Sequence, residues 1–100
     1  MLLLTKPATQ DRLNAAVVEI IGLNVTGSVC IPVGAQMMMM MRDAAGSTLR
    51  YAERRLKQSI ISLIQDSERG GVYFQVDNKL VCFCSDGVVE IHTLLENLLE

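Results

Sequence analysis

Aromatic residues are scarce in this chain, with two tyrosines, two phenylalanines and no tryptophan among 100 residues. The hydrophobic core must therefore be built from Leu, Ile, Val and Met. Half of the residues are hydrophobic, which is far more than a disordered segment contains. A chain of this length buries about two thirds of its unfolded surface when it folds, so one core forms without disulfide bonds or metal ions. We expect a single compact domain over residues 1–100.

Cysteine is also rare, and its odd count of three does not indicate a disulfide framework, because neither the spacing nor a secretory context is present. Long hydrophobic runs are missing as well. Met1–Leu4 and Met37–Met41 are shorter than the core of a signal peptide, about 7–15 residues, or a membrane span, about 20 residues. These absences predict a cytosolic protein with reduced thiols and no membrane partner.

An excess of one charge sign is absent too. The net charge of −2 argues against a protein whose main task is to coat nucleic acid or an anionic membrane. Basic residues nevertheless gather in one segment, and on a helix several of them share a stripe. This basic set is a candidate surface for phosphates or for an acidic protein, although a solvated face partly neutralised by Glu53 is the favoured interpretation. Its members are Arg42, Arg50, Arg54, Arg55 and Lys57.

Apolar residues at i, i+3 and i+4 spacing predict three helices. The first covers residues 7–22, and Gly22 or Asn24 can end it with a positive φ. The second covers residues 47–68, where Ser47 or Thr48 is a natural N-cap. The third follows Asp86 and continues to residue 99.

The segment between the first two helices has two interpretations. Residues 28–33 and 36–42 form a hairpin if glycine opens a two-residue type II′ turn between them. The missing N–H of Pro32 then points outward, which places the first strand at the edge of the sheet. Met, Ala and Gln are also good helix formers, so a short helix over residues 35–45 is the alternative to the second strand.

Residues 72–84 predict a second hairpin that turns at Asp77-Asn78, because both residues tolerate left-handed conformations. A two-residue turn pairs Phe74 with Val81 and sorts the side chains between two faces. The core face carries Val72, Phe74, Val76, Val81 and Phe83. The opposite, mixed face carries Tyr73, Gln75, Leu80, Cys82 and Cys84.

The predicted element order is α-β-β-α-β-β-α. It corresponds to an α+β fold in which three helices pack on a mainly antiparallel four-stranded sheet. Residues 2–4 provide an optional extra N-terminal strand.

Cys82-Phe83-Cys84 is the motif with the most chemical interest. Residues two apart on a strand point to the same side, so both thiols project together. Cys30 and His92 could complete a site for a soft metal ion. Without a second cysteine pair at zinc spacing, cysteines that pack as small hydrophobic residues are favoured. We therefore predict no metal and no cofactor, with Cys82 and Cys84 as weak metal candidates.

Enzyme signatures are missing from the sequence, which contains no G-x-S-x-G, no P-loop and no G-x-G-x-x-G. His92 has Glu96 at i+4 on the predicted last helix, where a modest surface contact is the usual outcome. The methionine run points its thioethers in several directions, which suits packing better than metal binding. We predict no catalytic residues and no enzymatic activity.

The predicted elements carry more apolar surface than one layer of helices can cover, and uncovered apolar patches usually mark interfaces. The last helix has more leucines than a single buried stripe needs. The expected interaction surface comprises Tyr73, Leu80, Leu94, Leu95, Leu98 and Leu99. We expect a small regulatory or interaction module, such as a small chaperone, a regulator or a phage-type inhibitor, that forms a homodimer and binds a further protein. A nucleic-acid-binding regulator that uses the basic set and a thiol or soft-metal protein are the alternatives.

Overall fold

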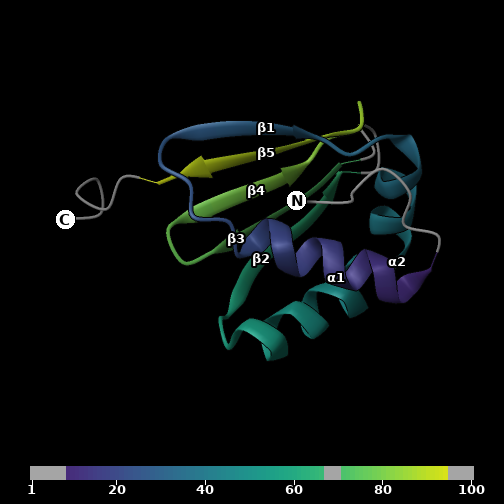
Figure 1. Ribbon diagram of the computed structural model, residues 1–100, viewed down its shortest axis with the longest axis horizontal. Coiled ribbons are helices and arrows are strands. Elements are labelled where there is room, and N and C mark those ends of the chain that lie inside the picture. Colours follow the sequence, from purple (N-terminus) through teal and green to yellow (C-terminus); the bar gives the residue numbers. More distant parts are fainter. Residues whose placement is uncertain (1–8, 67–70, 95–100) are drawn as a thin grey trace.

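The computed structural model describes residues 9–66 and 71–94, with residues 61–66 described by their backbone (Figure 1). Its elements are α1 (Gln10–Ile21), β1 (Ser28–Pro32), α2 (Ala35–Leu56), β2 (Ile60–Asp66), β3 (Gly71–Val76), β4 (Lys79–Phe83) and β5 (Val88–Thr93). The strands form one sheet in the order β1-β5-β4-β3-β2, and every neighbouring pair is antiparallel. The α+β class and the antiparallel sheet are confirmed. The predicted element order is wrong, and the described part of the chain holds two helices.

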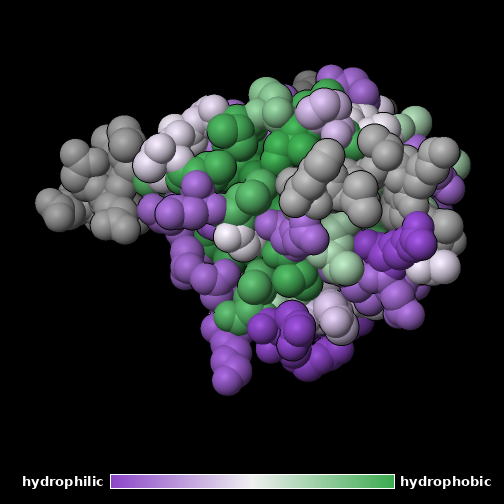
Figure 2. Space-filling model, in the orientation of Figure 1, coloured by the Kyte–Doolittle hydropathy of each residue, from purple (hydrophilic) through white to green (hydrophobic). Residues whose placement is uncertain are grey.

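Both helices cover the same face of the sheet, and the hydrophobic core lies between the two layers (Figure 1). Strand residues that alternate along the chain supply one side of this core, among them Phe74, Phe83 and Ile91. The helices supply the other side. The helix side also shows apolar surface in its middle, with polar residues at the rim (Figure 2).

The first helix is confirmed, with the predicted apolar stripe and the predicted C-terminal residue. Leu13, Val17 and Ile20 of α1 are fully buried, as their spacing predicts. The helix begins after Thr9, whose Oγ1 accepts from the Arg12 N–H at 3.2 Å. It ends at Gly22, but the predicted positive φ is wrong, because Gly22 has φ of −79°. The first residues of the predicted span, including Pro7, lie outside the described residues.

The methionine run is helical, so the predicted second strand over 36–42 is wrong and the alternative helix is confirmed. Unbranched Met, Gln and Ala lose little side-chain freedom in a helix, which favours this outcome. Gly34 has φ of 86°, which allows the chain to turn from β1 into α2. Met37 and Met41 are fully buried, whereas Met39 is 57% exposed on the outer side of α2.

Residues 43–46, which lie between the predicted strand over 36–42 and the predicted helix over 47–68, are helical, because α2 continues through them with one kink at Ala44 (φ −121°, ψ 17°). Ser47 and Thr48 are therefore interior helix residues and not N-caps. Thr48 is buried, and its hydroxyl accepts from Gln10 Nε2 at 2.8 Å. This hydrogen bond joins α2 to the start of α1.

The second predicted helix extends too far along the chain, because α2 ends at Leu56 and Lys57 takes a left-handed conformation. Residues 60–66 form β2 at the edge of the sheet. Their isoleucines continue the helical spacing of the preceding residues, but β-branched side chains also favour strands. Pairing with β3 decides the outcome, and the Ile60 N–H donates to the Glu53 carboxylate at 2.8 Å where the chain turns.

The hairpin over residues 72–84 is confirmed in its register, which pairs Phe74 with Val81. Asp77 has φ of 51° in the turn. The split into two faces is also confirmed. All five core-face residues are buried, and four of the five on the mixed face are half-buried, with Cys82 buried.

The third predicted helix is wrong, because residues 88–93 form β5 between β1 and β4. Val89 and Ile91 are buried and alternate with less buried residues, which is the pattern of a strand. The leucines that follow residue 93 have helical spacing, and the sequence analysis extended that helix back over residues 88–93. The Asp86 carboxylate accepts from the Val88 N–H in a turn, at 3.2 Å, and caps no helix. Residues 2–4 and 95–99 lie outside the described residues.

Strand β1 lies at the edge of the sheet, as the presence of Pro32 predicted, although its partner is β5 and not residues 36–42. The Val33 N–H donates to the Gly87 carbonyl oxygen at 2.8 Å, so the backbone groups of the odd-numbered residues of β1 point toward β5. The backbone nitrogen of Pro32, which has no hydrogen to donate, therefore points away from the sheet. Neither α1 nor α2, the helices of the described residues, is long and apolar enough to cross a membrane.

Candidate functional site

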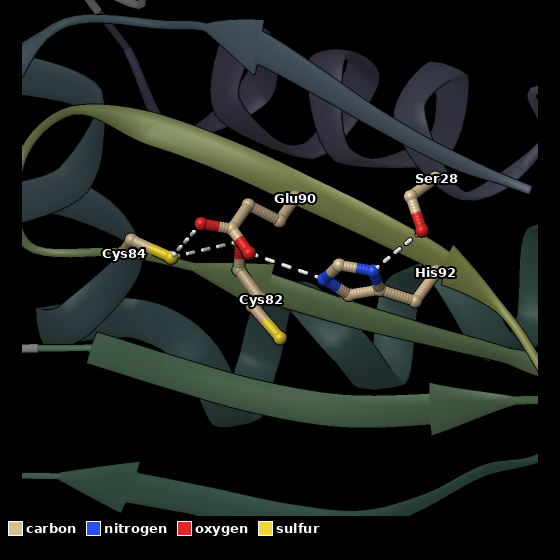
Figure 3. A network of polar contacts seen from close by, with 5 residues as sticks. All are labelled: Ser28, Cys82, Cys84, Glu90 and His92. Carbon is tan, nitrogen blue, oxygen red and sulfur yellow. Dashed lines mark hydrogen bonds and ion pairs between the residues drawn. The ribbon is translucent and has the colours of Figure 1, made fainter.

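The face of the sheet opposite the helices, called the open face here, carries three rows of side chains that the strand register places side by side. Both helices lie behind the sheet in the close view of this face (Figure 3). Polar residues gather on β1 and β5, and more apolar ones on β3 and β4. The rows are Tyr73, Cys82, Glu90 and Cys30; then Gln75, Leu80, His92 and Ser28; and finally Cys84, Val88 and Pro32.

Four polar side chains form a connected network across the open face (Figure 3). Ser28 Oγ lies 2.9 Å from His92 Nδ1, and His92 Nε2 lies 3.1 Å from Glu90 Oε1. In the neutral tautomer that carries its proton on Nε2, His92 donates to the Glu90 carboxylate and its Nδ1 accepts from the Ser28 hydroxyl. The Cys84 thiol donates to Glu90 Oε2 at 3.6 Å. The carboxylate therefore joins an imidazole on one side and a thiol on the other.

The two thiols of the C-x-C motif hold their protons tightly. Burial, followed by the charge of Glu90, raises the pKa of Cys82 above 9.0. The same two causes, in the same order, raise the pKa of Cys84 to about 11. A thiolate is the form that attacks electrophiles and binds metal ions, so the raised pKa values favour the protonated, less nucleophilic form of both groups. All three cysteines are free thiols, and Cys30 is the exposed one.

The order Ser28, His92 and Glu90 matches the sequence of nucleophile, base and orienting acid found in hydrolases. Acyl transfer also requires a water-excluded site in which donors stabilise an oxyanion. Here the His92 and Glu90 side chains are 38% and 39% exposed, and their contact is screened by water. The arrangement can orient hydrogen-bond donors and acceptors toward a binding partner.

The strand register brings the metal candidates to one face without making them converge. Cys82, Cys84, His92 and Cys30 all lie on the open face, but they are spread over three rows, and Glu90 separates Cys82 from Cys30 in the row that these two share. Within residues 9–66 and 71–94, no three His, Cys, Asp or Glu side chains are arranged to hold a metal ion.

Glu90 and Ser28 are the members of the network that the sequence analysis missed. The assumed helix paired His92 with Glu96, whereas His92 contacts Glu90 two residues away on β5. Glu96 itself lies outside the described residues. The alternation of Val89 and Ile91 with Glu90 and His92 was the signal that could have identified the contact.

The expected interaction surface is partly brought together. Tyr73 and Leu80 lie on neighbouring strands of the open face, and both are half-buried. Leu94 follows β5, where its N–H donates to the Asn78 carbonyl oxygen at 2.6 Å. Leu95, Leu98 and Leu99 lie outside the described residues, so their share of the surface stays a prediction.

The basic set lies entirely on α2 and at its end, and all five side chains are exposed: Arg42, Arg50, Arg54, Arg55 and Lys57. Glu53, the residue expected to neutralise them, instead binds the Ile60 N–H.

Comparison with protein-family models, curated proteins and solved structures gave no match.

Proposed function

We propose that this protein is a small non-enzymatic interaction module that forms a homodimer through the open face of its sheet. The observation that supports this proposal is that α1 and α2, the helices of the described residues, both lie on the other side of the sheet from three rows of strand side chains (Figure 3). A sheet packed on one side only commonly faces solvent with alternating polar residues. Here the face also carries Tyr73, Leu80 and Val88, which are half-buried.

A second copy suits this face because polar and apolar groups are arranged side by side. The apolar side chains on β3 and β4 give a twofold-related copy an area to bury. The Ser28–His92–Glu90 network offers donors and acceptors that fix the register of the two copies. A stable interface of this kind buries at least about 1,000 Å² in total.

Charge placement in the middle of the open face tests the proposal. Leu80→Glu puts a carboxylate beside His92 and between two copies, and light scattering at micromolar concentration should show monomers. Met39→Glu is the matched control, because Met39 is exposed on the helix side. It should leave the dimer intact.

A second variant guards against a folding defect in Leu80→Glu. Ser28 is exposed at the sheet edge, so Ser28→Arg should also weaken the dimer while its far-ultraviolet circular dichroism stays unchanged. A dimer that tolerates both open-face variants but dissociates with Met39→Glu would place the interface on the helix side and refute the proposal.

A nucleic-acid-binding regulator is the second candidate function. One observation favours it, because the Glu53 carboxylate is bonded to a backbone N–H and leaves Arg50, Arg54, Arg55 and Lys57 exposed together. Phosphate contacts weaken steeply with salt, whereas apolar association does not. A gel shift at low salt that Arg54→Glu abolishes, while the dimer is unaffected, would support this function.

A further inference from the structure

The C-terminal end of α2 concentrates positive charge. Arg54, Arg55 and Lys57 are exposed there, and in the part of the chain that the structure describes none of them has an ion pair. The negative end of a helix dipole corresponds to roughly half an elementary charge, which is less than these three cations supply. Two carboxylates near this end are bonded to neutral donors, Glu53 to the Ile60 N–H and Asp77 to Gln58 Nε2. We call Arg54, Arg55 and Lys57 the basic end.

The last described residue lies at the same end of the sheet as this cluster. The register aligns Thr93, Lys79, Val76 and Ile60 in one row across β5, β4, β3 and β2. Two hydrogen bonds to the turn between β3 and β4 connect Leu94 with Gln58, the residue that follows the basic end. The Leu94 N–H donates to the Asn78 oxygen at 2.6 Å, and Gln58 Nε2 donates to Asp77 Oδ2 at 3.0 Å in the same turn. Neighbouring strands are about 4.8 Å apart, so the row spans roughly 14 Å.

The residues that follow have the complementary charge and sufficient length. Residues 95–100 read Leu-Glu-Asn-Leu-Leu-Glu, with two acids and no cation. Six extended residues span at most about 20 Å, which exceeds the width of the row. The half-buried side chains of Leu56 and Ile60 lie beside the basic end and offer apolar surface to the leucines.

We propose that residues 95–100 dock on the basic end of α2 in the same molecule, with Glu96 or Glu100 paired to Arg54, Arg55 or Lys57. The segment then occupies the surface that an external polyanion would use. A nucleic acid must displace it to bind there. This contact is independent of the dimer through the open face, because the two involve different sides of the molecule.

Zero-length carbodiimide crosslinking of the full chain tests the contact directly, because it joins an amine to a carboxylate only when they touch. The sequence has three lysines, Lys6, Lys57 and Lys79, so the product is identified by mass spectrometry. We expect Lys57 joined to Glu96 or Glu100 at low salt, with the yield lost at high salt. Lys57→Arg keeps the charge without the amine, and the paired variant Glu96→Gln, Glu100→Gln removes the acids. Each should abolish the product.

Mixing isotope-labelled and unlabelled protein before crosslinking identifies which molecule supplies the segment. Products that contain only one isotope support docking within a molecule. Mixed-isotope products would overturn the proposal in favour of a second copy. Crosslinks of Glu96 and Glu100 to Lys6 or Lys79 alone would overturn it as well. Gel-shift binding of an oligonucleotide that Arg54→Glu abolishes, but that the paired glutamine variant leaves unchanged, would likewise contradict docking on this surface.

Discussion

The ammonium group of Lys79 in β4 donates to the carbonyl oxygen of Ile21 at the end of α1, with 2.6 Å between the two atoms. It also donates to the Leu23 oxygen at 3.1 Å. The last carbonyl groups of a helix have no partner within the helix, so a strand residue satisfies them here. Lys79 thereby links the end of α1 to β4, in addition to the core packing of the helix.

Lys79→Met keeps the length of the side chain and removes both hydrogen bonds. Bonds to a charged group contribute about 1.5–3 kcal/mol, so the free energy of unfolding should fall by about that amount. Denaturant titration measures the change. Lys57→Met, at an exposed position, should alter stability by no more than about 0.5 kcal/mol. Equal effects of the two substitutions would mean that Lys79 does not cap α1.

Phe83→Ala should destabilise the protein by about 3–5 kcal/mol, as expected when a large core side chain is truncated. Phe83 is 1% exposed, and its ring stacks on Phe74 with the centroids 6.0 Å apart. Tyr51→Ala is the control, because Tyr51 is exposed on α2. A loss below about 1 kcal/mol in the denaturant midpoint would show that Phe83 is not in the core.

Glu53→Ala should shift the denaturant midpoint because it deprives the Ile60 N–H of its acceptor at the turn from α2 into β2. The expected loss is about 1.5–3 kcal/mol, reduced by partial exposure to water. Glu53→Gln retains an acceptor oxygen and should restore much of the stability. Glu19→Ala, at an exposed position of α1, should have little effect. Equal denaturant midpoints for Glu53→Gln and Glu53→Ala would show that the hydrogen bond to the Ile60 N–H does not stabilise the protein.

The protein should lose stability between pH 9 and about pH 11. The pKa of Cys84 is raised from 9.0 to about 11, first by burial and then by the charge of Glu90. In this window the unfolded chain has released the thiol proton and the folded chain still holds it, so the free energy of unfolding falls as pH rises. Cys84→Ser should flatten the decline in thermal midpoint over this range. A profile that is unchanged by Cys84→Ser would contradict the raised pKa.

Alkylation rates offer a check on the same thiols. At pH 8 Cys30 should be modified first, because it is exposed, while Cys82 is buried and Cys84 keeps its proton. Peptide mapping after a short exposure to iodoacetamide would rank the three. Modification of Cys84 ahead of Cys30 would show that its thiolate is more accessible than the structure indicates.

Local sequence signals predicted α1 and the β3–β4 hairpin because both form from neighbouring residues. Asp77 tolerates positive φ, and the alternation around Phe74 and Val81 sets the register. The errors arose where partners are distant in sequence. Residues 60–66 form a strand by pairing with β3, and residues 88–93 form one by pairing with β1 and β4. Apolar residues at helical spacing in and after these segments favoured helices when the sequence was considered alone.

The candidate site was predicted in part for the same reason. The strand alternation placed Cys82, Leu80 and Tyr73 on one face from the sequence alone. Ser28 could not be added, because its contact with His92 depends on β5 pairing with β1. Glu90 was missed because residues 88–93 were assigned to a helix, in which residues two apart do not face each other.

Sedimentation velocity of the unmodified protein over a range of micromolar concentrations tests the central claim, self-association through the open face. The account predicts a species of twice 11.0 kDa that dissociates on dilution. Leu80→Glu should sediment at 11.0 kDa at every concentration, with its far-ultraviolet circular dichroism unchanged. An unmodified protein that stays at 11.0 kDa throughout would contradict the claim.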